Sequence, residues 1–458
     1  MKLRDSFILG MLLATSLAFG EECVVKNVRL EGVFHSDLPS MYQNLSGESC
    51  AKIDVLNRQL INWHLNHGFP FAKVFWELDS SGLAVIYLDR GSAWVWAPPE
   101  NKELGKTKKD VFGKLTGLEI GDPVSLENLD RAEKKLARNG YYEKTAPVRL
   151  YRDPVRNRLI PLFSMADLRS NHLEGYLTYA SGEEGGWSGT LLVDLYNING
   201  TARDLSISGE TGEWERNLTF AYKEPWLLGT LWSGILRGYV EEDSSYRDAR
   251  LEAGIARAIG FDFEFSILGG VGDDEWTTSL EMKFRDEDRF ILPRSGSRLD
   301  AAMTVLKKRN TDSTDVRVFL EGSGRHLMPI YGNFILQSSF WAGTILPTNR
   351  EYGLEDLYSL GGIDNLKGFR PGFFRSRAYG ATEIDLQWQG LPKTAFHLFF
   401  QPSLHRARSP EQGWVDSYSY GLGLTQYRES WSVSLYYAMN KGGDPLNGLL
   451  HLGVKSLF

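Results

Sequence analysis

The chain has very little cysteine and no long apolar run. Only two of its 458 residues are cysteine, so disulfides cannot hold the whole protein together and most of its stability has to come from the fold. No apolar stretch reaches the roughly 18 residues that a membrane-spanning helix needs. The sequence therefore excludes a disulfide-rich scaffold and a membrane protein built from apolar helices.

The chain also lacks an excess of positive charge and the short motifs of common enzyme classes. Its formal net charge is −7, which provides no basic surface for nucleic acid. It contains no Gly-x-Ser-x-Gly elbow, no P-loop and no dinucleotide fingerprint. Its cysteines and histidines are not spaced to complete a four-ligand metal site. The sequence thus predicts a protein that is not an enzyme, uses no cofactor or metal, and does not bind nucleic acid.

The first twenty residues are typical of a secretory signal peptide. Lys2 and Arg4 precede an apolar run over residues 7–17, after which small residues offer a cleavage site. A membrane anchor is the alternative, but the run is too short for one. Because an exported chain reaches a compartment that permits disulfides, we expect Cys23 and Cys50 to pair at the edge of the first folded module.

Two similar α+β modules are predicted over residues 23–91 and 92–166. In the first, apolar residues at helical spacing indicate a helix over residues 53–66, and two strands follow it. In the second, a helix begins after Ser125 and ends at Gly140, again with two strands behind it. The recurrence of the same order in two successive stretches indicates an internal repeat.

From residue 172 to residue 458 apolar and polar side chains alternate with a period of two. Over residues 261–267, for example, every odd position is a large apolar residue, whereas Asp262, Glu264 and Ser266 take the even positions. A soluble β-sandwich also alternates. Here, however, charge and glycine lie across from large aromatics over strands of about ten residues, as in outer-membrane barrels whose apolar side faces lipid. The predicted fold class is therefore a transmembrane all-β protein.

Counting the alternating segments gives an antiparallel β-barrel of about 16 strands, an even number as in bacterial outer-membrane barrels. Fourteen and eighteen strands are the alternatives, because strand boundaries are the least reliable part of such a reading. The two α+β modules precede this barrel. Both ends of an even-stranded barrel lie on the same side of the membrane, so the modules are expected on the side where the chain also ends.

The barrel must close, because lipid offers no partner for an unpaired strand edge. Its last strand carries apolar residues on one face: Leu450, Leu452, Val454 and the terminal Phe458. This strand is expected to meet the first strand, near residues 173–179. Gly453 brings no side chain to the contact. We therefore predict a weak seam between the first and last strands.

The longest connection among the strands runs from about Leu346 to Arg377. A connection beyond ~12–15 residues is usually functional or disordered, and this one is rich in glycine and basic residues. Its central residues are Gly361, Gly362, Leu366, Lys367, Gly368, Phe369 and Arg370. We predict that the loop folds back into the barrel and is held there by its basic side chains. A solvated basic loop outside the barrel is the alternative.

Several stretches resemble one family, the BamA/TamA outer-membrane assembly barrels with their two-partner secretion relatives. The helix-to-strand corners at residues 68–74 and 139–142 look like those of POTRA domains. Four stretches resemble parts of the family barrel in the same order along the chain: residues 194–200, 220–226, 291–299 and 361–369. The resemblance covers nearly the whole chain after the signal peptide, and it implies that the two modules are POTRA domains.

The resemblance also implies an ion pair inside the barrel. In the family, an arginine of a Val-Arg-Gly-Phe/Tyr motif in the loop pairs with acidic residues on neighbouring strands. Lys367 stands at that position here and lacks the planar fork for bidentate pairing, so Arg370 is a second candidate. The family's acidic residue on the thirteenth strand is replaced by residues 400–403. Glu383 and Asp385 remain as lumen partners for one of the two cations.

A location and a function follow from the same resemblance. The chain is expected in the cell outer membrane, with the POTRA domains in the periplasm, as a factor that inserts or translocates other proteins. Expected partners are the lipid bilayer, unfolded or partly folded outer-membrane or secreted proteins, and periplasmic accessory proteins. Clients would add a strand to a module edge and then to the weak seam. Two alternatives stay open: a two-partner secretion transporter that exports one dedicated substrate, and, from a different class, a passive diffusion channel.

Overall fold

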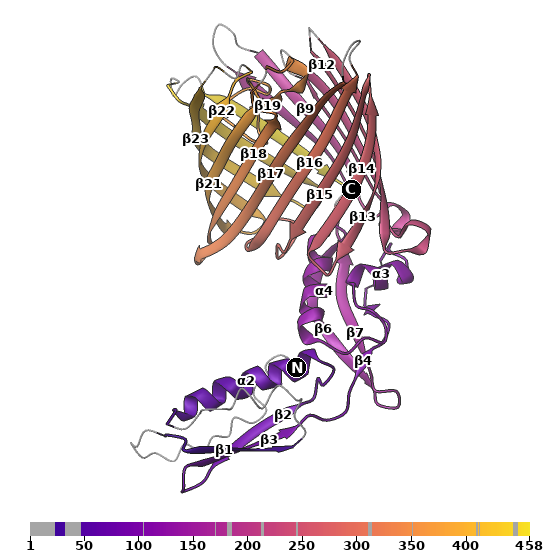
Figure 1. Cartoon of the computed structure of the whole chain (residues 1–458), viewed down its shortest axis with the longest axis vertical. Helices are drawn as coiled ribbons and strands as arrows, with labels where there is room; N and C mark the ends of the chain where they lie inside the picture. The colour runs from indigo at the N-terminus through magenta and orange to yellow at the C-terminus, as the bar shows by residue number, and fades with distance from the viewer. Residues whose placement is uncertain are drawn as a thin grey trace. The chain divides into compact units, whose positions relative to one another are not determined.

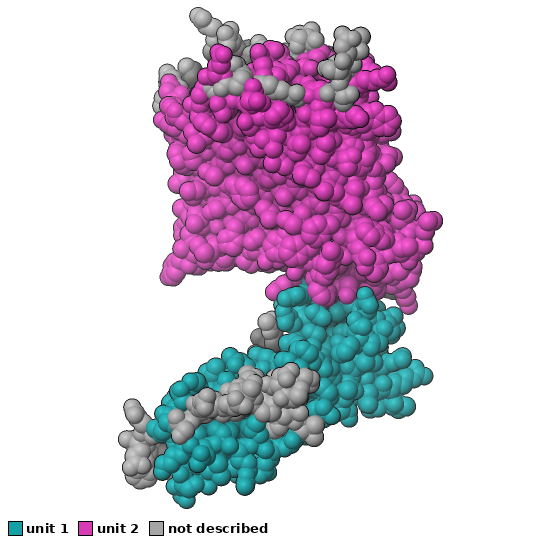
Figure 2. All heavy atoms as spheres, in the orientation of Figure 1, with its two compact units in different colours: residues 1–100, 118–131, 148–163 teal, residues 101–117, 132–147, 164–458 magenta. Residues whose placement is uncertain are grey.

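The computed structural model describes residues 23–32, 47–103, 105–169, 171–180, 186–211, 215–243, 246–309, 314–349, 351–408, 411, 413–442 and 448–458. The predicted signal peptide lies outside these residues. The chain divides into two compact units (Figure 2). The first holds residues 1–100, 118–131 and 148–163, and the second holds residues 101–117, 132–147 and 164–458. Among the helices of the described residues, none is long and apolar enough to cross a membrane.

The first module packs one helix on a three-stranded sheet. Its elements are β1 (Asn27–Gly32), α2 (Cys50–Asn66), β2 (Lys73–Leu78) and β3 (Leu83–Asp89). Strand β3 is central, parallel to β1 and antiparallel to β2. Ile53 and Leu60, seven residues apart on one face of α2, are fully buried against Ala84 and Ile86 of β3. The helical spacing of apolar residues therefore forms this core. Within the part of the module that the structure describes, β1 and β2 are the sheet edges.

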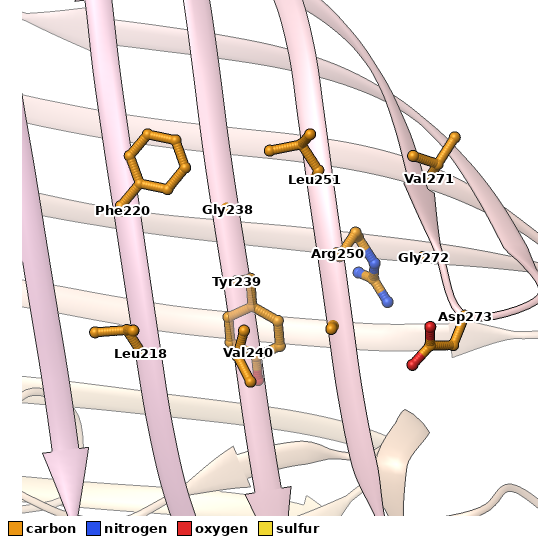
Figure 3. Close-up of a pocket in the computed structure, with 11 residues that line it drawn as sticks. Leu218, Phe220, Gly238, Tyr239, Val240, Arg250, Leu251, Val271, Gly272 and Asp273 are labelled. Carbon is orange, nitrogen blue, oxygen red and sulfur yellow. The ribbon is translucent and has the colours of Figure 1, made fainter.

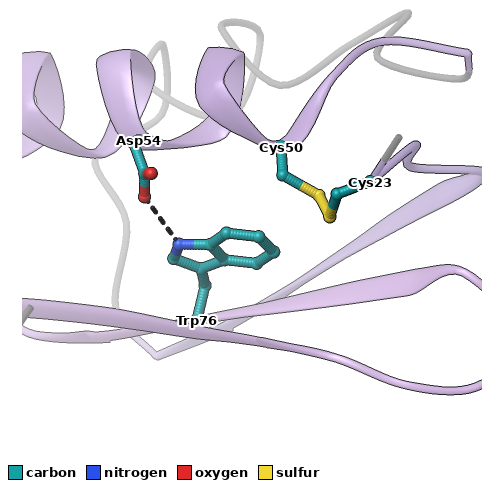
Figure 4. Close-up of a disulfide and its surroundings, with 4 residues drawn as sticks. All are labelled: Cys23, Cys50, Asp54 and Trp76. Carbon is teal, nitrogen blue, oxygen red and sulfur yellow. Dashed lines mark hydrogen bonds between the residues drawn. A yellow bond between two sulfur atoms is a disulfide. The ribbon is translucent and has the colours of Figure 1, made fainter. Parts of the chain in front are cut away.

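A disulfide joins Cys23 to Cys50, the first residue of α2, with the two Cα atoms 5.5 Å apart (Figure 4). Closing a loop of this length removes unfolded-state entropy equivalent to roughly 3.5 kcal/mol. One turn further along α2, Asp54 Oδ1 accepts a hydrogen bond of 2.9 Å from the indole Nε1 of Trp76 on β2. The start of the helix is thus held both to the chain before β1 and to the sheet.

The second module is also α+β, and its elements fall in both compact units. They are β4 (Val95–Trp96), β5 (Glu100–Asn101), α3 (Lys109–Thr116), α4 (Leu126–Arg138), β6 (Tyr142–Asp153) and β7 (Arg158–Asp167). Strand β7 pairs with β4, β5 and β6. Ser125 caps α4 as its residue type predicts, because its Oγ accepts the Asn128 N–H at 3.1 Å. Gly140, with φ of +82°, follows the end of α4.

Sixteen antiparallel strands close into a barrel (Figure 1), so the predicted fold class is confirmed. They are β8 (His172–Ala180), β9 (Gly186–Leu195), β10 (Asp204–Thr211), β11 (Glu215–Glu224), β12 (Trp232–Asp243), β13 (Arg247–Ile259), β14 (Phe263–Gly272), β15 (Glu275–Arg285), β16 (Gly296–Arg309), β17 (Thr314–Tyr331), β18 (Phe334–Leu346), β21 (Ala378–Leu391), β22 (Thr394–Arg406), β23 (Trp414–Tyr427), β24 (Trp431–Asn440) and β25 (Leu449–Leu457). We call the end at which β8 begins proximal and the opposite end distal.

The two faces of the barrel wall have opposite character. Large apolar side chains point outward and are about half exposed, as Ile267, Leu398 and Leu422 illustrate. The residues next to such positions point inward and are mostly polar, as Ser266 beside Ile267 and Gln401 beside Phe400 illustrate. In a soluble sandwich the apolar face would be covered by a second sheet, so that alternative is wrong. An apolar surface that surrounds the whole barrel is the surface that a barrel presents to lipid.

The seam between β8 and β25 is fully paired. Its register runs over eight residue pairs, from Leu450 opposite Tyr179 to Leu457 opposite His172, and the neighbouring pair β24–β25 also has eight. The expected gap at Gly453 is absent, because a Cβ there would lie 2.2 Å from the ring of Tyr176 on β8. An aromatic ring across the strands covers the glycine. The ladder on its other side, β8–β9, has nine pairs, and the weakness of the seam stays a prediction.

Two segments before the barrel, residues 101–117 and 132–147, belong to the same compact unit as the barrel. They contact its proximal turns. Arg138 of α4 pairs with Asp262, between β13 and β14, at 2.5 Å. The short helix η2 (Ile198–Gly200) ends in a glycine whose Cβ position would lie 2.0 Å from a backbone oxygen of the first segment. The close contact therefore requires glycine at position 200.

Candidate functional site

The connection between β18 and β21, described over residues 347–349 and 351–377, folds as a hairpin inside the barrel. It contains the short helix η4 (Leu354–Asp356) and a two-stranded ladder of β19 (Tyr358–Leu360) with β20 (Phe374–Ser376). Beyond the ladder, Leu366 and Phe369 are buried against Ala381 on β21. Apolar packing therefore holds the tip of the hairpin on the barrel wall, and we call residues 361–373 the lumen tip.

Two glycines of the lumen tip are required by its geometry. Gly361 has a φ of +126°, and a Cβ there would lie 1.9 Å from the Arg370 carbonyl oxygen. Gly368 approaches the barrel wall so closely that a Cβ would lie 2.4 Å from the Cβ of Ser419. Both positions exclude any side chain. The loop can therefore occupy this position in the barrel only because it has glycine at positions 361 and 368.

Lys367 places its charge in the barrel wall. Its Nζ forms an ion pair with Glu383 on β21, and the two side chains are only 12% and 5% exposed. The same Nζ lies 5.1 Å from the ring centroid of Phe399 and 5.8 Å from that of Tyr436, where both rings can stabilise a cation. Because water is largely excluded, the two charges depend on one another, and loss of either leaves the other buried without its partner.

Gln401 on β22 is the centre of a hydrogen-bond network around this ion pair. Its Nε2 donates to Glu383 at 2.7 Å and to the Asn365 carbonyl at 2.9 Å. Its Oε1 accepts the backbone N–H of Lys367 at 2.9 Å and the hydroxyl of Ser419 at 2.7 Å. The amide is fully buried and uses both its donors and its acceptor. It binds the backbone of the lumen tip in the region where the family resemblance predicts an acidic residue.

The carbonyl groups of the lumen tip are bound from the last strands. His451 Nε2 on β25 lies 2.7 Å from the Lys367 oxygen, and Asn440 Nδ2 on β24 donates to the Gly368 oxygen at 3.0 Å. The other ring nitrogen of His451 lies 2.8 Å from the hydroxyl of Thr178 on β8. The lumen tip is therefore hydrogen-bonded to the seam itself.

The hairpin is also held on the other side of the lumen. Arg375 pairs with Glu241 on β12 at 3.1 Å. In η4, Asp356 pairs with Arg317 on β17. Together with the pair on β21, these contacts extend from β12 to β21. Because it is held at both sides, the hairpin crosses the lumen. The alternative, a basic loop that extends outside the barrel, is therefore wrong.

The structure brings together some of the predicted site residues and separates others. The cation that meets Glu383 is Lys367, whereas Arg370 lies further along the lumen tip, where its carbonyl accepts the Phe373 N–H at 3.2 Å. Asp385 faces His397 Nδ1 at 2.8 Å rather than a cation of the hairpin. Of the two acidic residues left open as partners, the structure therefore pairs only Glu383 with the loop motif.

Four residues of the network were not predicted as site residues: Gln401, Ser419, Asn440 and His451. Their only signal in the sequence is that they are polar at inward-facing positions of the strands after the loop. Many residues of the barrel share that signal, so it does not single them out. Among the described residues, no cluster of three or more histidine, cysteine or acidic side chains is arranged to hold a metal.

Comparisons with known proteins concern the fold. No protein-family model matches the chain, and no curated protein sequence matches it. The solved structure of CdiB from Acinetobacter baumannii is 14% identical, with a TM-score of 0.59, over 96% of this chain and 91% of its own. CdiB from Escherichia coli is also 14% identical, with a TM-score of 0.59, over 98% and 93%.

A third similar structure is BamA from Haemophilus ducreyi lacking POTRA domains 1–3. It is 12% identical over 95% of this chain and 100% of its own, and its TM-score of 0.48 is too low to support an argument. At 14% identity the two CdiB structures show a likeness of fold alone. That likeness covers nearly the whole chain and includes the closed sixteen-strand barrel.

Proposed function

We propose that the chain is an outer-membrane factor that inserts or translocates other proteins, with residues 23–91 and 92–166 as POTRA domains in the periplasm. The observation that carries this proposal is the hairpin held across the lumen, by Lys367 on one side and Arg375 on the other. A hairpin bound at both sides obstructs free diffusion of solutes. This counts against a passive channel and favours a barrel whose lumen or seam is opened by a client.

The first module offers an edge for client capture. Among the described residues, β1 and β2 are the two edges of its sheet, and an edge strand presents unpaired backbone groups to an added strand. Beside the β2 edge, Phe75 stacks on Tyr87 with ring centroids 4.8 Å apart and remains 50% exposed. We assign to this edge the binding of extended, partly apolar segments of unfolded clients.

The seam between β8 and β25 is the proposed place of transfer into lipid. Its eight residue pairs are too many to break without replacement, because lipid offers no partner for free backbone groups. A client strand that replaces β8 along β25 restores these hydrogen bonds as it enters, so the exchange is nearly balanced. Since His451 and Thr178 connect both strands to the lumen tip, movement of the hairpin and opening of the seam are coupled.

A second candidate function is export of one dedicated substrate through the lumen, as in two-partner secretion. It is favoured by a cavity of about 690 Å³ beside the hairpin, lined mainly by polar and charged residues of β10–β17 and the lumen tip. An extended polypeptide would follow this cavity once the hairpin moved aside. The fold likeness to the CdiB structures supports the barrel and does not distinguish the two functions.

Depletion of the protein, followed by quantitation of the outer-membrane and secreted proteins, tests both candidates. Insertion predicts loss of many barrel proteins, whereas dedicated export predicts loss of one secreted protein. Unchanged levels of both groups would contradict the proposal. Complementation with Lys367→Gln should fail. Complementation with Lys441→Gln, which removes an exposed lysine paired with Asp416 at the barrel rim, should succeed.

A further inference from the structure

The apolar outer wall of the barrel is interrupted near the distal end by a groove. It has a volume of about 370 Å³ and lies on β11–β14 (Figure 3). Most of the residues that line it belong to two outward-facing rows, and Tyr239, Arg250 and Asp273 also contribute to the lining. One row consists of residues that are register partners across four neighbouring strands: Phe220, Gly238, Leu251 and Val271. The next row towards the distal end consists of three register partners: Leu218, Val240 and Ala249.

Small residues create the hollow. Gly238 and Ala249 have longer side chains beside them in both rows, so the groove lies over these two small residues. A Cβ at Gly238 would lie 2.6 Å from the ring of Phe220, which means that this ring lies over β12 and closes the proximal side of the groove. Leu218 and Leu251 remain 54% and 49% exposed. The groove is therefore open outward and distally.

A charged row stands immediately beyond the distal side of the groove. The register continues with Arg216 opposite Glu242 and Glu242 opposite Arg247, on the same outward-facing parity as the apolar rows. Within the described residues neither arginine forms an ion pair. In this outward-facing row, two guanidinium groups flank one carboxylate, so the row by itself carries a net positive charge.

We propose that the groove holds an acyl chain of a phosphorylated lipid of the distal leaflet, whose phosphate lies on Arg216 and Arg247. An outward groove in lipid is filled by hydrocarbon, and its volume lies within the ~300–1,000 Å³ of ligand pockets. Guanidinium groups form strong, charge-assisted hydrogen bonds to phosphate. Glu242 lies opposite both arginines in the register, so the site has a place for one anion and not for two. Apolar groove and cationic rim together match one amphipathic anion.

This inference goes beyond the proposed function, because it concerns lipid rather than clients. Strands β9 and β10 separate the groove from the seam, so a lipid held there does not occupy the proposed place of transfer. It depends on the membrane location of the barrel and not on what the barrel does to other proteins.

Titration of the delipidated full chain in dodecylmaltoside with diphosphorylated lipid A, followed by native mass spectrometry, tests the inference. Ala249→Leu fills the hollow, and Arg216→Gln with Arg247→Gln removes the cations. Each change should weaken lipid A binding roughly tenfold, the loss expected for a charged hydrogen bond or a blocked chain. The matched controls are both on β13. Ala253→Leu lies outside the groove, and Arg257→Gln lies near the proximal end of the strand. Both should bind as the parent chain does.

Equal binding by the parent chain and the two groove variants would overturn the inference, and so would diacylglycerol, which carries no phosphate, binding as tightly as lipid A. The arginine variants change only exposed rim residues, so they keep the test valid if Ala249→Leu folds poorly. The readout contains no client. A failed lipid result therefore leaves the depletion phenotype unaffected, and a failed depletion experiment leaves the lipid result unaffected.

Discussion

The imidazole Nε2 of His451 donates to the carbonyl oxygen of Lys367 across 2.7 Å. A carbonyl only accepts, so the proton is on Nε2, and Nδ1 is left to accept the Thr178 hydroxyl at 2.8 Å. His451 is on the last strand of the barrel, Thr178 on the first, and Lys367 on the lumen tip. One buried ring thus joins three parts of the chain that are far apart in sequence.

Replacing His451 by leucine should destabilise the barrel by about 1–3 kcal/mol, because the Lys367 carbonyl is left buried without its donor. The midpoint of the heat-induced loss of folded-barrel mobility on gels measures the effect. His451→Gln can still donate to the carbonyl and should lose less. The control is His326→Leu, since His326 contacts Ser297 at an exposed site. Equal midpoints for the His451 and His326 variants would show that the ring does not hold the hairpin.

The pair of Lys367 with Glu383 should show strong energetic coupling. Either single change, Lys367→Gln or Glu383→Gln, leaves a buried charge and should cost about 3–5 kcal/mol. The double variant leaves no charge, so it should cost much less than the sum of the two. A double-mutant cycle in the same unfolding assay gives the coupling directly. Additive single effects would mean that the two side chains do not interact in the folded barrel.

Loss of the disulfide should weaken the first module and leave the barrel intact. Replacing Cys23 and Cys50 by serine removes the constraint on the unfolded chain and should cost roughly 3.5 kcal/mol. Limited proteolysis of the full chain should then cut residues 47–91 faster, whereas heat-induced mobility of the barrel stays the same. Treatment of the parent chain with dithiothreitol should reproduce the effect. Unchanged proteolysis in both cases would contradict this prediction.

The contact of α4 with the proximal turns should depend on pH through Lys135. Its ammonium lies 5.8 Å from the ring centroid of Phe261, and burial, together with nearby Arg138, lowers the pKa of Lys135 from 10.5 to about 8. Below pH 8 the lysine is charged in both the folded and the unfolded state, and the cost of burying that charge is fully present. Between about pH 8 and 10.5 only the unfolded chain keeps the proton, so stability rises with pH.

Comparison with Lys135→Gln isolates this contribution, because glutamine does not titrate. As pH rises from 8 to 10, the unfolding midpoint of the parent chain should increase relative to that of the Lys135→Gln variant. An NMR titration of the lysine side chain should give a midpoint near pH 8 for Lys135. A pH-independent difference would show that Lys135 is not buried against the turn.

The sequence predicts the barrel well because the two faces of each strand meet two different solvents. A residue such as Ile267 faces hydrocarbon and its neighbour Ser266 faces the lumen, so apolar and polar residues alternate along the strands. The count of sixteen strands follows from this alternation. The hairpin was predictable for a related reason. Gly361 and Gly368 are required by backbone geometry, and their density marks the connection as more than a linker.

The parts that sequence reasoning missed depend on partners far away in the chain. Gly453 looks like a gap until Tyr176, on the other end of the barrel sequence, is placed over it. Gln401 looks like any other inward polar residue until the lumen tip reaches it. The contact of Arg138 with Asp262 joins residues 124 positions apart. Periodicity reports the environment of a residue, not the identity of its neighbour.

The ring of Tyr176 over Gly453 affects any client strand that pairs with β25 in place of β8. Displacing β8 withdraws that ring, and the bare backbone of Gly453 is then open to the lumen. A guest strand with an aromatic residue at that register would restore the cover, and one with alanine or serine there would not. If clients insert along β25 as proposed, the barrel edge would therefore favour client strands with an aromatic residue at this one position.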